Sequence, residues 1–221
     1  MKAAVLKVCP EARFVDINHE IPAFDIAVAG FVLWAGSQGF PPGTVHLAVV
    51  DPGVGSDRRA LALAVGLAFF VGPDNGLFSM VAARRRDVRA VALPCPAPVS
   101  ATFEGRDLFA PAAGHLACGR PLAELGRPVE DLVVLPDAGP SVIWVDRFGN
   151  LVTNLVPPVG RLWVGDAVVV KSARTYSEGP AGEPFWYAGS LGLVEIGVRE
   201  GRADELLRAG PGTRIVELPS P

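Results

Sequence analysis

Two carboxylates in this sequence each follow an apolar run that ends in a turn rich in glycine and proline. Residues 45–50 lead into Asp51, and residues 61–71 lead through Gly-Pro into Asp74 and Asn75. Apolar, β-branched runs of this kind are typical of buried strands, which Pro and Gly end. Because α/β sheets bind ligands beyond the carboxyl ends of their strands, both carboxylates are candidates for binding or acid–base chemistry.

Arg58 follows Asp51 closely enough for its guanidinium to fold back onto that carboxylate. The other interpretation is a plain Asp-Pro-Gly turn with an exposed arginine, and composition does not separate the two. Two more polar groups, 103–107 (Phe-Glu-Gly-Arg-Asp) and 146–150 (Asp-Arg-Phe-Gly-Asn), lie near predicted element ends. Each alone is typical of a turn or cap. Together they favour a site where an aromatic ring holds a flat heterocycle and polar groups contact its edges.

Common catalytic and metal-binding signatures are absent from the sequence. It has no G-x-S-x-G, H-E-x-x-H, Walker A or G-x-G-x-x-G segment. His19, His46 and His115 are not at the spacing of metal ligands. We therefore expect no metal in the chemistry.

Composition restricts the class of protein. The 221 residues are 50% hydrophobic and 19% charged, with a formal net charge of -3, and basic residues form no dense patch beyond 84–86. This is a globular composition and argues against nucleic acid and membrane partners. The three cysteines, Cys9, Cys95 and Cys118, form no C-x-x-C pair. They predict a reducing, cytoplasmic location without a disulfide framework.

Periodicity divides the chain in two. Helices are predicted at 1–8, 25–39 and 108–118, the last with Asp107 as a candidate N-cap, and a strand at 14–17. After residue 140 the pattern changes to short strands separated by turns. We predict an α/β domain over 1–130 with a mainly parallel central sheet, a linker over 131–140, and a smaller, barrel-like β-rich domain over 141–221.

Six segments, in order along essentially the whole chain, resemble the S-adenosylmethionine hydroxide adenosyltransferases, which are relatives of the fluorinase and chlorinase enzymes. The segments are His-Glu-Ile-Pro at 19–22, Phe-Pro-Pro-Gly-Thr-Val at 40–45, Val-Asp-Pro-Gly-Val-Gly-Ser at 50–56, Val-Gly-Pro-Asp-Asn-Gly at 71–76, Thr-Phe-x-Gly-Arg-Asp at 102–107, and Asp-x-Phe-Gly-Asn-x-x-Thr-Asn at 146–154.

The resemblance implies an α/β domain followed by a β-rich domain, in a homotrimer whose active sites lie between neighbouring subunits. It also implies a reaction in which water or hydroxide attacks the 5' carbon of S-adenosylmethionine, giving adenosine and L-methionine. S-Adenosylmethionine is then the substrate, and no cofactor is required.

The resemblance also assigns residues. The aspartate and arginine that hold the attacking water map onto Asp51 and Arg58, and Glu104 stands where the family has histidine. The halogenases carry tyrosine at the position of Asp51, which favours hydroxide over halide here. Aromatic walls, contacts with the adenine and the amino-acid end, and backbone contacts from the second domain give the substrate-binding set Phe24, Asp74, Asn75, Phe103, Asp146, Phe148, Asn150, Ser190 and Leu191.

Two departures from the family pattern lead to an alternative. The family opens with a strand bearing Thr-Asp-Phe-Gly, and this chain begins at what resembles the following Met-Lys. We expect that a sheet without this strand has an unpaired edge and binds substrate more weakly. Glu104 in place of histidine is the second departure. The favoured function is an adenosine-forming S-adenosylmethionine hydrolase, and the alternative is a catalytically impaired protein that binds adenosine or S-adenosylmethionine.

Overall fold

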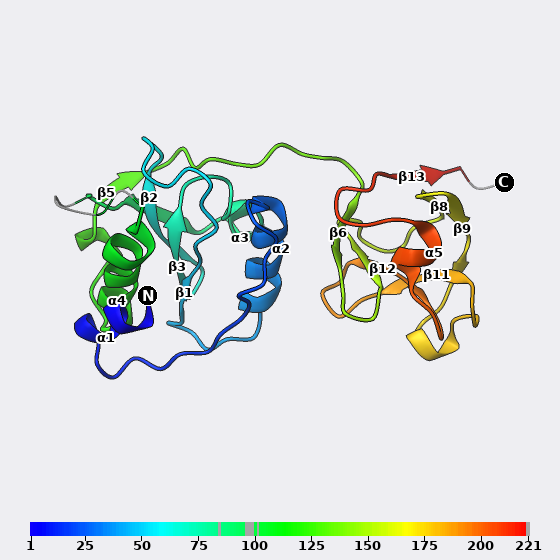
Figure 1. The fold of residues 1–221 in the computed structure, drawn as a ribbon, viewed down its shortest axis with the longest axis horizontal. Helices are drawn as coiled ribbons and strands as arrows, with labels where there is room; N and C mark the ends of the chain where they lie inside the picture. Colours follow the sequence, from blue (N-terminus) through cyan, green and yellow to red (C-terminus); the bar gives the residue numbers. More distant parts are fainter. Residues whose placement is uncertain (84, 96–99, 101, 220–221) are drawn as a thin grey trace. The chain divides into compact units, whose positions relative to one another are not determined.

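The computed structural model describes residues 1–83, 85–95, 100 and 102–219. It forms two compact units, Met1–Leu135 and Pro136–Pro221 (Figure 1), and the boundary falls within the predicted linker. The first unit combines helices with one sheet, and the second is built mostly of short strands. The prediction of an α/β unit followed by a β-rich unit is confirmed.

The first unit contains a five-stranded sheet in the order β1-β3-β2-β4-β5. Within this sheet, as far as the described residues show, only β1 and β3 pair in parallel, so the prediction of a mainly parallel sheet is wrong. The reason is local, because Gly66 and Leu67 alone join β2 to β3, and so short a connection makes neighbouring strands antiparallel. The strands are β1 (Val45–Leu47), β2 (Ala60–Val65), β3 (Ala68–Pro73), β4 (Val88–Ala92) and β5 (Arg127–Val129).

Helices cover both faces of this sheet (Figure 1). Val71 of β3 packs with Phe109 and Leu116 in the core beneath α4. Its neighbour Phe70 makes an edge-to-face contact with Phe78 on the other face, towards α2 and α3. The helices of this unit are α1 (Lys2–Val8), α2 (Ile26–Ser37), α3 (Ser79–Ala83), the π-helix η1 (Gly105–Phe109), α4 (Ala110–Ala117) and the short 3-10 helix η2 (Leu122–Glu124).

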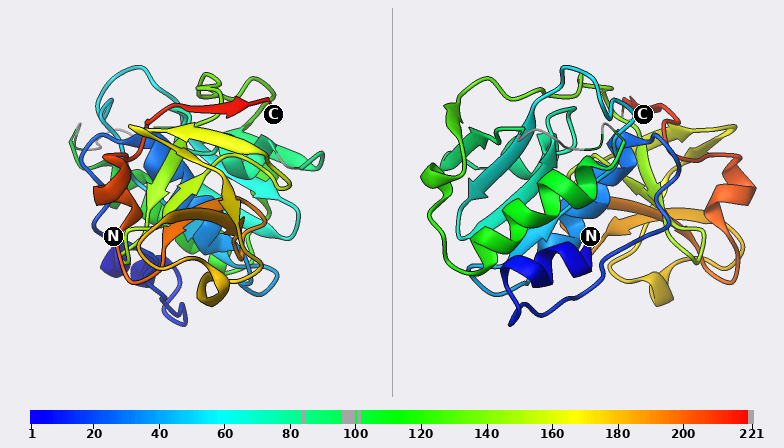
Figure 2. Two further views of the ribbon diagram at one scale, coloured as in Figure 1. Left: turned by 90° about the vertical axis from the view of Figure 1, so that its right-hand side faces the viewer. Right: turned by 60° about the vertical axis from the view of Figure 1, so that its left-hand side comes forward.

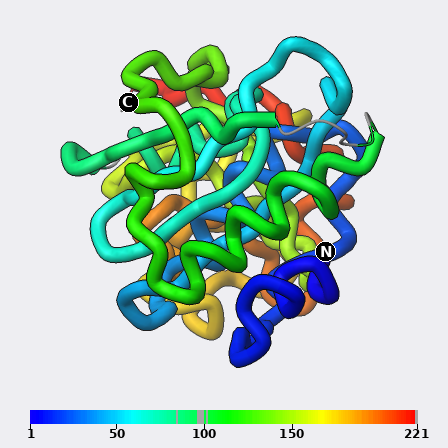
Figure 3. Tube along the Cα trace, turned by 90° about the vertical axis from the view of Figure 1, so that its left-hand side faces the viewer, coloured from blue at the N-terminus to red at the C-terminus, as the bar shows by residue number. Residues whose placement is uncertain are grey.

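Helix α1 lies beside α4 (Figures 2 and 3). The two approach closely at Gly114, where an added Cβ would lie 2.9 Å from Cβ of Val8. Cys9, just after α1, forms a disulfide with Cys118, just after α4. The prediction of no disulfide is therefore wrong. The sequence did not indicate the pair because helix packing alone brings these distant cysteines together.

Two local predictions are also corrected. Residues 14–17 form no strand, because the segment is exposed and packs in no sheet, and Asp16 binds Lys2 at the surface with 2.6 Å between Nζ and Oδ2. Asp107 is not an N-cap, since it lies inside η1 and pairs with Arg106. Asp25, by contrast, caps α2 by accepting a hydrogen bond from the Val28 amide at 2.9 Å.

The second unit contains two sheets, ordered β10-β11-β12-β7-β6 and β13-β8-β9 (Figure 2). Apolar residues from both sheets and from α5 share one core, and a bridge between Ser141 and Arg214 joins the sheets at one edge. The predicted barrel is thus two packed sheets. The elements are β6 (Val142–Val145), β7 (Leu151–Thr153), β8 (Arg161–Val164), β9 (Ala167–Val169), β10 (Lys171–Ser172), η3 (Tyr176–Glu178), β11 (Pro184–Ala188), β12 (Val194–Val198), α5 (Ala203–Leu207) and β13 (Ile215–Leu218).

In the described part of the chain, no helix has both the length and the apolar character needed to cross a membrane.

Gly72 lets β3 lie close to β1 near the carboxyl ends of the two strands. A Cβ there would lie 2.2 Å from the Ala48 carbonyl oxygen, which is backbone and cannot swing aside. We expect Gly72→Ala to lower the free energy of unfolding by about 1–3 kcal/mol, measured by urea denaturation. Gly160→Ala is the control, since its Cβ would meet only the Leu218 carbonyl oxygen at 3.9 Å. Equal stability of the two variants would contradict this packing.

Candidate active site

The polar residues that follow β1 and β3 meet at one end of the sheet, as the sequence predicts. Because β1 and β3 are parallel, their carboxyl ends lie side by side. The side-chain amide of Asn75 donates a hydrogen bond to the Val50 carbonyl at 2.9 Å, and its oxygen accepts from the Leu77 amide at 3.2 Å. Asn75 therefore holds the strand end that carries Asp51.

Asp51, Arg58 and Glu104 form one buried group, called the trio below. The Arg58 guanidinium binds both oxygens of Asp51, with Nε–Oδ1 at 2.9 Å and Nη2–Oδ2 at 2.5 Å. The same Nη2 also donates to Oε2 of Glu104. Side-chain exposure is 5% for Asp51, 10% for Arg58 and 12% for Glu104. Formally the trio carries one net negative charge, screened little by water.

The surroundings keep the guanidinium charged. Burial lowers the pKa of Arg58, but hydrogen bonds and charges from Asp51 and Glu104 outweigh burial and leave the pKa above its ordinary value. The guanidinium carbon also lies 5.2 Å from the centre of the buried Phe109 ring. Phe109 ends the π-helix that Glu104 precedes, so this one turn supplies both the second carboxylate and the aromatic ring. Such π-helical turns are frequent at functional sites.

Asp74 lies at the same end of the sheet but its carboxylate is occupied. It is 5% exposed, with Oδ2 bound to Nε of Arg59 at 2.7 Å and Oδ1 accepting from the Val133 amide at 2.9 Å. Arg59 also pairs with Asp131 at 2.7 Å. In this structure Asp74 and Asn75 hold the strand ends and the segment leading to the second unit.

The two aromatic candidates of the first unit lie at its surface. Phe103, beside Glu104, is 54% exposed, and the Arg106 guanidinium carbon lies 4.7 Å from its ring centre. Phe24 is 76% exposed and has φ of 68°, a left-handed conformation that is unusual for an aromatic residue. Exposed rings with backbone strain are a known mark of ligand or partner contact. The structure does not bring Phe24 into the trio.

In the second unit, Asp146 organises the turn between β6 and β7. Its Oδ1 accepts from the amides of Phe148 and Asn150 at 2.8 and 2.9 Å, and its Oδ2 accepts from the Asn150 side chain at 2.9 Å. Asn150 is buried, whereas the Phe148 ring is exposed. The turn therefore presents an aromatic ring beside an oriented amide.

Ser190 and Leu191 lie in the tight turn from β11 to β12, which the Gly189 amide closes onto the Leu193 carbonyl at 2.8 Å. Ser190 is exposed and Leu191 half-buried. Sequence reasoning missed the residues beneath this turn, Glu195 and Tyr187, which share a 2.7 Å hydrogen bond. The available signal was a glutamate inside the apolar strand Leu-Val-Glu-Ile.

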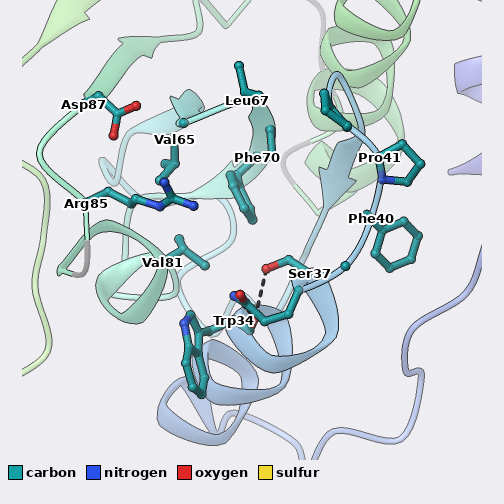
Figure 4. A pocket seen from close by; sticks show the side chains of 15 residues that line it. Trp34, Ser37, Phe40, Pro41, Val65, Leu67, Phe70, Val81, Arg85 and Asp87 are labelled. Carbon is teal, nitrogen blue, oxygen red and sulfur yellow. Dashed lines mark hydrogen bonds between the residues drawn. The ribbon is translucent and has the colours of Figure 1, made fainter. Parts of the chain in front are cut away.

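A separate cleft of about 560 Å³ lies at the opposite end of β2 and β3, beside the turn that joins them (Figure 4). Trp34, Phe70 and Val81 form its inner wall and Arg85 lies at one side. Every predicted site residue lies outside its lining. Among the described residues, no three His, Cys, Asp or Glu side chains are grouped to hold a metal ion.

Comparisons with known proteins match the chain over nearly its whole length. The family model described as SAM hydroxide adenosyltransferase N-terminal domain matches residues 1–126, and the corresponding C-terminal domain matches 140–216. The protein named (R)-S-adenosyl-L-methionine hydrolase from Thermus thermophilus is 44% identical, with 97% of this chain and 91% of that protein covered. Its namesake from Salinispora tropica is 40% identical, covering 95% and 87%.

More distant relatives include a protein named fluorinase from Actinoplanes sp., 27% identical over 73% of this chain and 64% of that protein. Among solved structures, an uncharacterized conserved protein from Thermotoga maritima superposes with a TM-score of 0.88. It is 33% identical, with 97% of this chain and 92% of that one covered.

The buried trio predicts a large loss of stability when its one cation is removed. Arg58→Met leaves two buried carboxylates without a partner, so we expect the free energy of unfolding to fall by about 3–5 kcal/mol in denaturant titrations. Arg120→Met is the control, because its pair with Glu124 is exposed at the surface and should contribute less than about 1 kcal/mol. Similar losses of stability in both variants would show that the trio contributes no more to stability than an exposed ion pair does.

Proposed function

The chain belongs to the SAM hydroxide adenosyltransferase family, and on that premise we propose that it hydrolyses S-adenosyl-L-methionine to adenosine and L-methionine. The observation that carries the proposal is the buried trio at the carboxyl end of β1, with Arg58 fixing the Asp51 carboxylate. Relatives at 40–44% identity that are named (R)-S-adenosyl-L-methionine hydrolase support the same substrate.

In the proposed reaction a water molecule bound to Asp51 attacks the 5' carbon of the substrate. The carbon–sulfur bond breaks, its electron pair stays on sulfur as methionine, and the water proton passes to the carboxylate. The sulfonium is a good leaving group, so the protein mainly has to align the water and remove competing solvent. A positioned base adds about 10² to 10⁴ in rate. Arg58 keeps the Asp51 carboxylate oriented.

Glu104 supplies a second acceptor next to the water site. Its carboxylate is anchored on the same Nη2 as Asp51, so the two acids are held apart by the guanidinium between them. A second negative charge also attracts the cationic sulfonium. We propose that Glu104 takes the place of the histidine expected from the family pattern by accepting a hydrogen bond from the water.

Substrate contacts are proposed to come from both units. Phe24 and Phe103 supply exposed rings for the ribose and sulfonium, and Asn150 and Phe148 supply an oriented amide and a ring for adenine. Asp146 and the turn at Ser190 and Leu191 contact the amino-acid end. Because Asp74 and Asn75 have their polar atoms engaged within the protein, we assign them to positioning Asp51.

We further propose a homotrimer in which the first unit of one subunit and the second unit of its neighbour complete each site. The support is the division of the candidate contacts between two compact units, together with the exposed ring of Phe24, whose backbone is left-handed.

The proposed reaction is tested by incubating the purified chain with S-adenosylmethionine in H₂¹⁸O. We expect equimolar adenosine and methionine, with one ¹⁸O atom in the 5' hydroxyl of adenosine by mass spectrometry. Label appearing in the other product, or no product at all, would overturn the proposal. Tight binding without turnover would favour the alternative of an impaired binding protein.

The roles within the trio are separated by conservative variants. We expect Asp51→Asn to lower kcat by at least about tenfold, roughly 1.4 kcal/mol of barrier, because the amide cannot take the water proton. Glu104→Gln should lower kcat less, because its amide oxygen keeps an acceptor in place. Circular dichroism and thermal melting serve as folding controls. If Glu104→Gln abolishes hydrolysis while Asp51→Asn retains it, Glu104 is the base.

The trimer is tested by light scattering coupled to size-exclusion chromatography. We expect the mass of three chains at micromolar concentration, because a site completed by a neighbour requires a stable interface. In mixtures of Asp51→Asn and Asn150→Ala subunits, activity should partly return, since some sites receive an intact residue from each variant. A monomer with full activity would contradict the proposal.

A further inference from the structure

Glu195 lies on the face of its sheet that carries the candidate adenine contacts. In the register of β12 it is paired with Tyr187 of β11 and Val152 of β7. Two residues further along β12, a Cβ added at Gly197 would lie 3.0 Å from Oδ1 of Asn150. Residues two apart on a strand share a face. Glu195 therefore lies on the same side of the sheet as Asn150.

The carboxylate also reaches the turn that holds Ser190. A Cβ added at Gly189 would lie 2.0 Å from Oε1 of Glu195, so this oxygen lies directly against the turn backbone. Oε2 accepts a hydrogen bond from the Tyr187 hydroxyl at 2.7 Å. Glu195 is thus placed between the Asn150 turn and the Ser190 turn, both of which the proposed function uses.

Glu195 has no cationic partner among the described residues. The basic side chains of neighbouring turns are engaged elsewhere, with Arg202 on Asp204 at 2.7 Å and Arg199 on Glu200 at 3.0 Å. Burial is the main cause that raises the pKa of Glu195, and the nearby charge of Asp146 raises it further, while the Tyr187 hydrogen bond acts in the opposite direction.

An acid in this position costs stability at neutral pH. A partly buried carboxylate with another carboxylate nearby and no cation is unfavourable, and natural proteins retain such groups mainly where function requires them. The counter-charge missing from the described residues then has to arrive with a ligand. In the proposed reaction the substrate carries such a charge in the ammonium of its amino-acid end, which the proposed function places at Asp146 and the Ser190 turn.

We propose that Glu195 is a specificity-determining residue whose carboxylate selects ligands that carry the ammonium of the amino-acid end over ligands that lack it. The inference rests on the proposed function, because it assumes that the nucleoside binds over Asn150. In this proposal Glu195 affects which ligand binds, and the trio alone aligns the water.

Two analogues that cannot be hydrolysed test the proposal by calorimetry. S-Adenosylhomocysteine keeps the ammonium of the amino-acid end, and 5'-methylthioadenosine lacks the amino-acid end. For Glu195→Gln we expect the Kd of S-adenosylhomocysteine to rise about tenfold while the Kd of 5'-methylthioadenosine changes less than twofold. Glu217→Gln, which removes an exposed carboxylate from β13, is the matched control and should change neither Kd.

Equal weakening of both ligands would overturn the proposal and assign Glu195 a structural role through Tyr187, and unchanged binding of both would overturn it too. The outcome is independent of turnover. If the wild-type chain fails to hydrolyse S-adenosylmethionine but shows the charge preference in a Glu195-dependent way, the proposed function fails and this inference stands. If hydrolysis occurs without the preference, only the inference fails.

Stability gives a second readout for the unliganded protein. The pKa of Glu195 is raised from its ordinary value of 4.5 in the folded state. The contribution of Glu195 to the free energy of unfolding is therefore favourable below that pH. It is lost as pH rises through the folded pKa. We expect Glu195→Gln to melt at a higher temperature than wild type at pH 7, with the difference vanishing near pH 4. If Glu195→Gln melts at a lower temperature than wild type at pH 7, the Glu195 carboxylate is not an uncompensated charge.

Discussion

The buried guanidinium of Arg58 is the interaction on which the site depends. Two carboxylates from segments far apart in the chain, Asp51 and Glu104, bind the same nitrogen of Arg58, and neither is more than 12% exposed. Without a cation between them, two buried carboxylates so close together would have no partner and would destabilise the fold. Arg58 therefore fixes the charge of the site, the distance between its acids, and the approach of the π-helix to the sheet.

The parts of the first unit that surround the trio hold the strand ends in place. Asn75 binds the backbone just before Asp51, and Gly72 allows β1 to lie close to β3. Asp74 and Arg59 tie the segment at residues 131–133 to the same end of the sheet. Catalysis by alignment requires such rigidity, because a small displacement of the water loses much of the rate.

The second unit differs in its electrostatics. Asp146 is satisfied by three hydrogen bonds within its own turn, whereas Glu195 has a tyrosine hydroxyl and no cation among the described residues. The hydrogen bonds within the turn orient Asp146, whereas the negative charge of Glu195 has no counter-charge among the described residues.

The sequence alone determined the family, the division into an α/β and a β-rich unit, and the grouping of Asp51 with Arg58, because strand-ending turns and motif order are local features. Only the tertiary structure decided three other matters. The two-residue connection at Gly66 made the sheet mostly antiparallel, and packing of α1 on α4 joined Cys9 to Cys118. Strand register placed Glu195 under the Ser190 turn. The disulfide depends on packing between segments that are distant in sequence. The other two depend on the strand direction and register that short hairpins adopt, which residue types and their spacing do not specify directly.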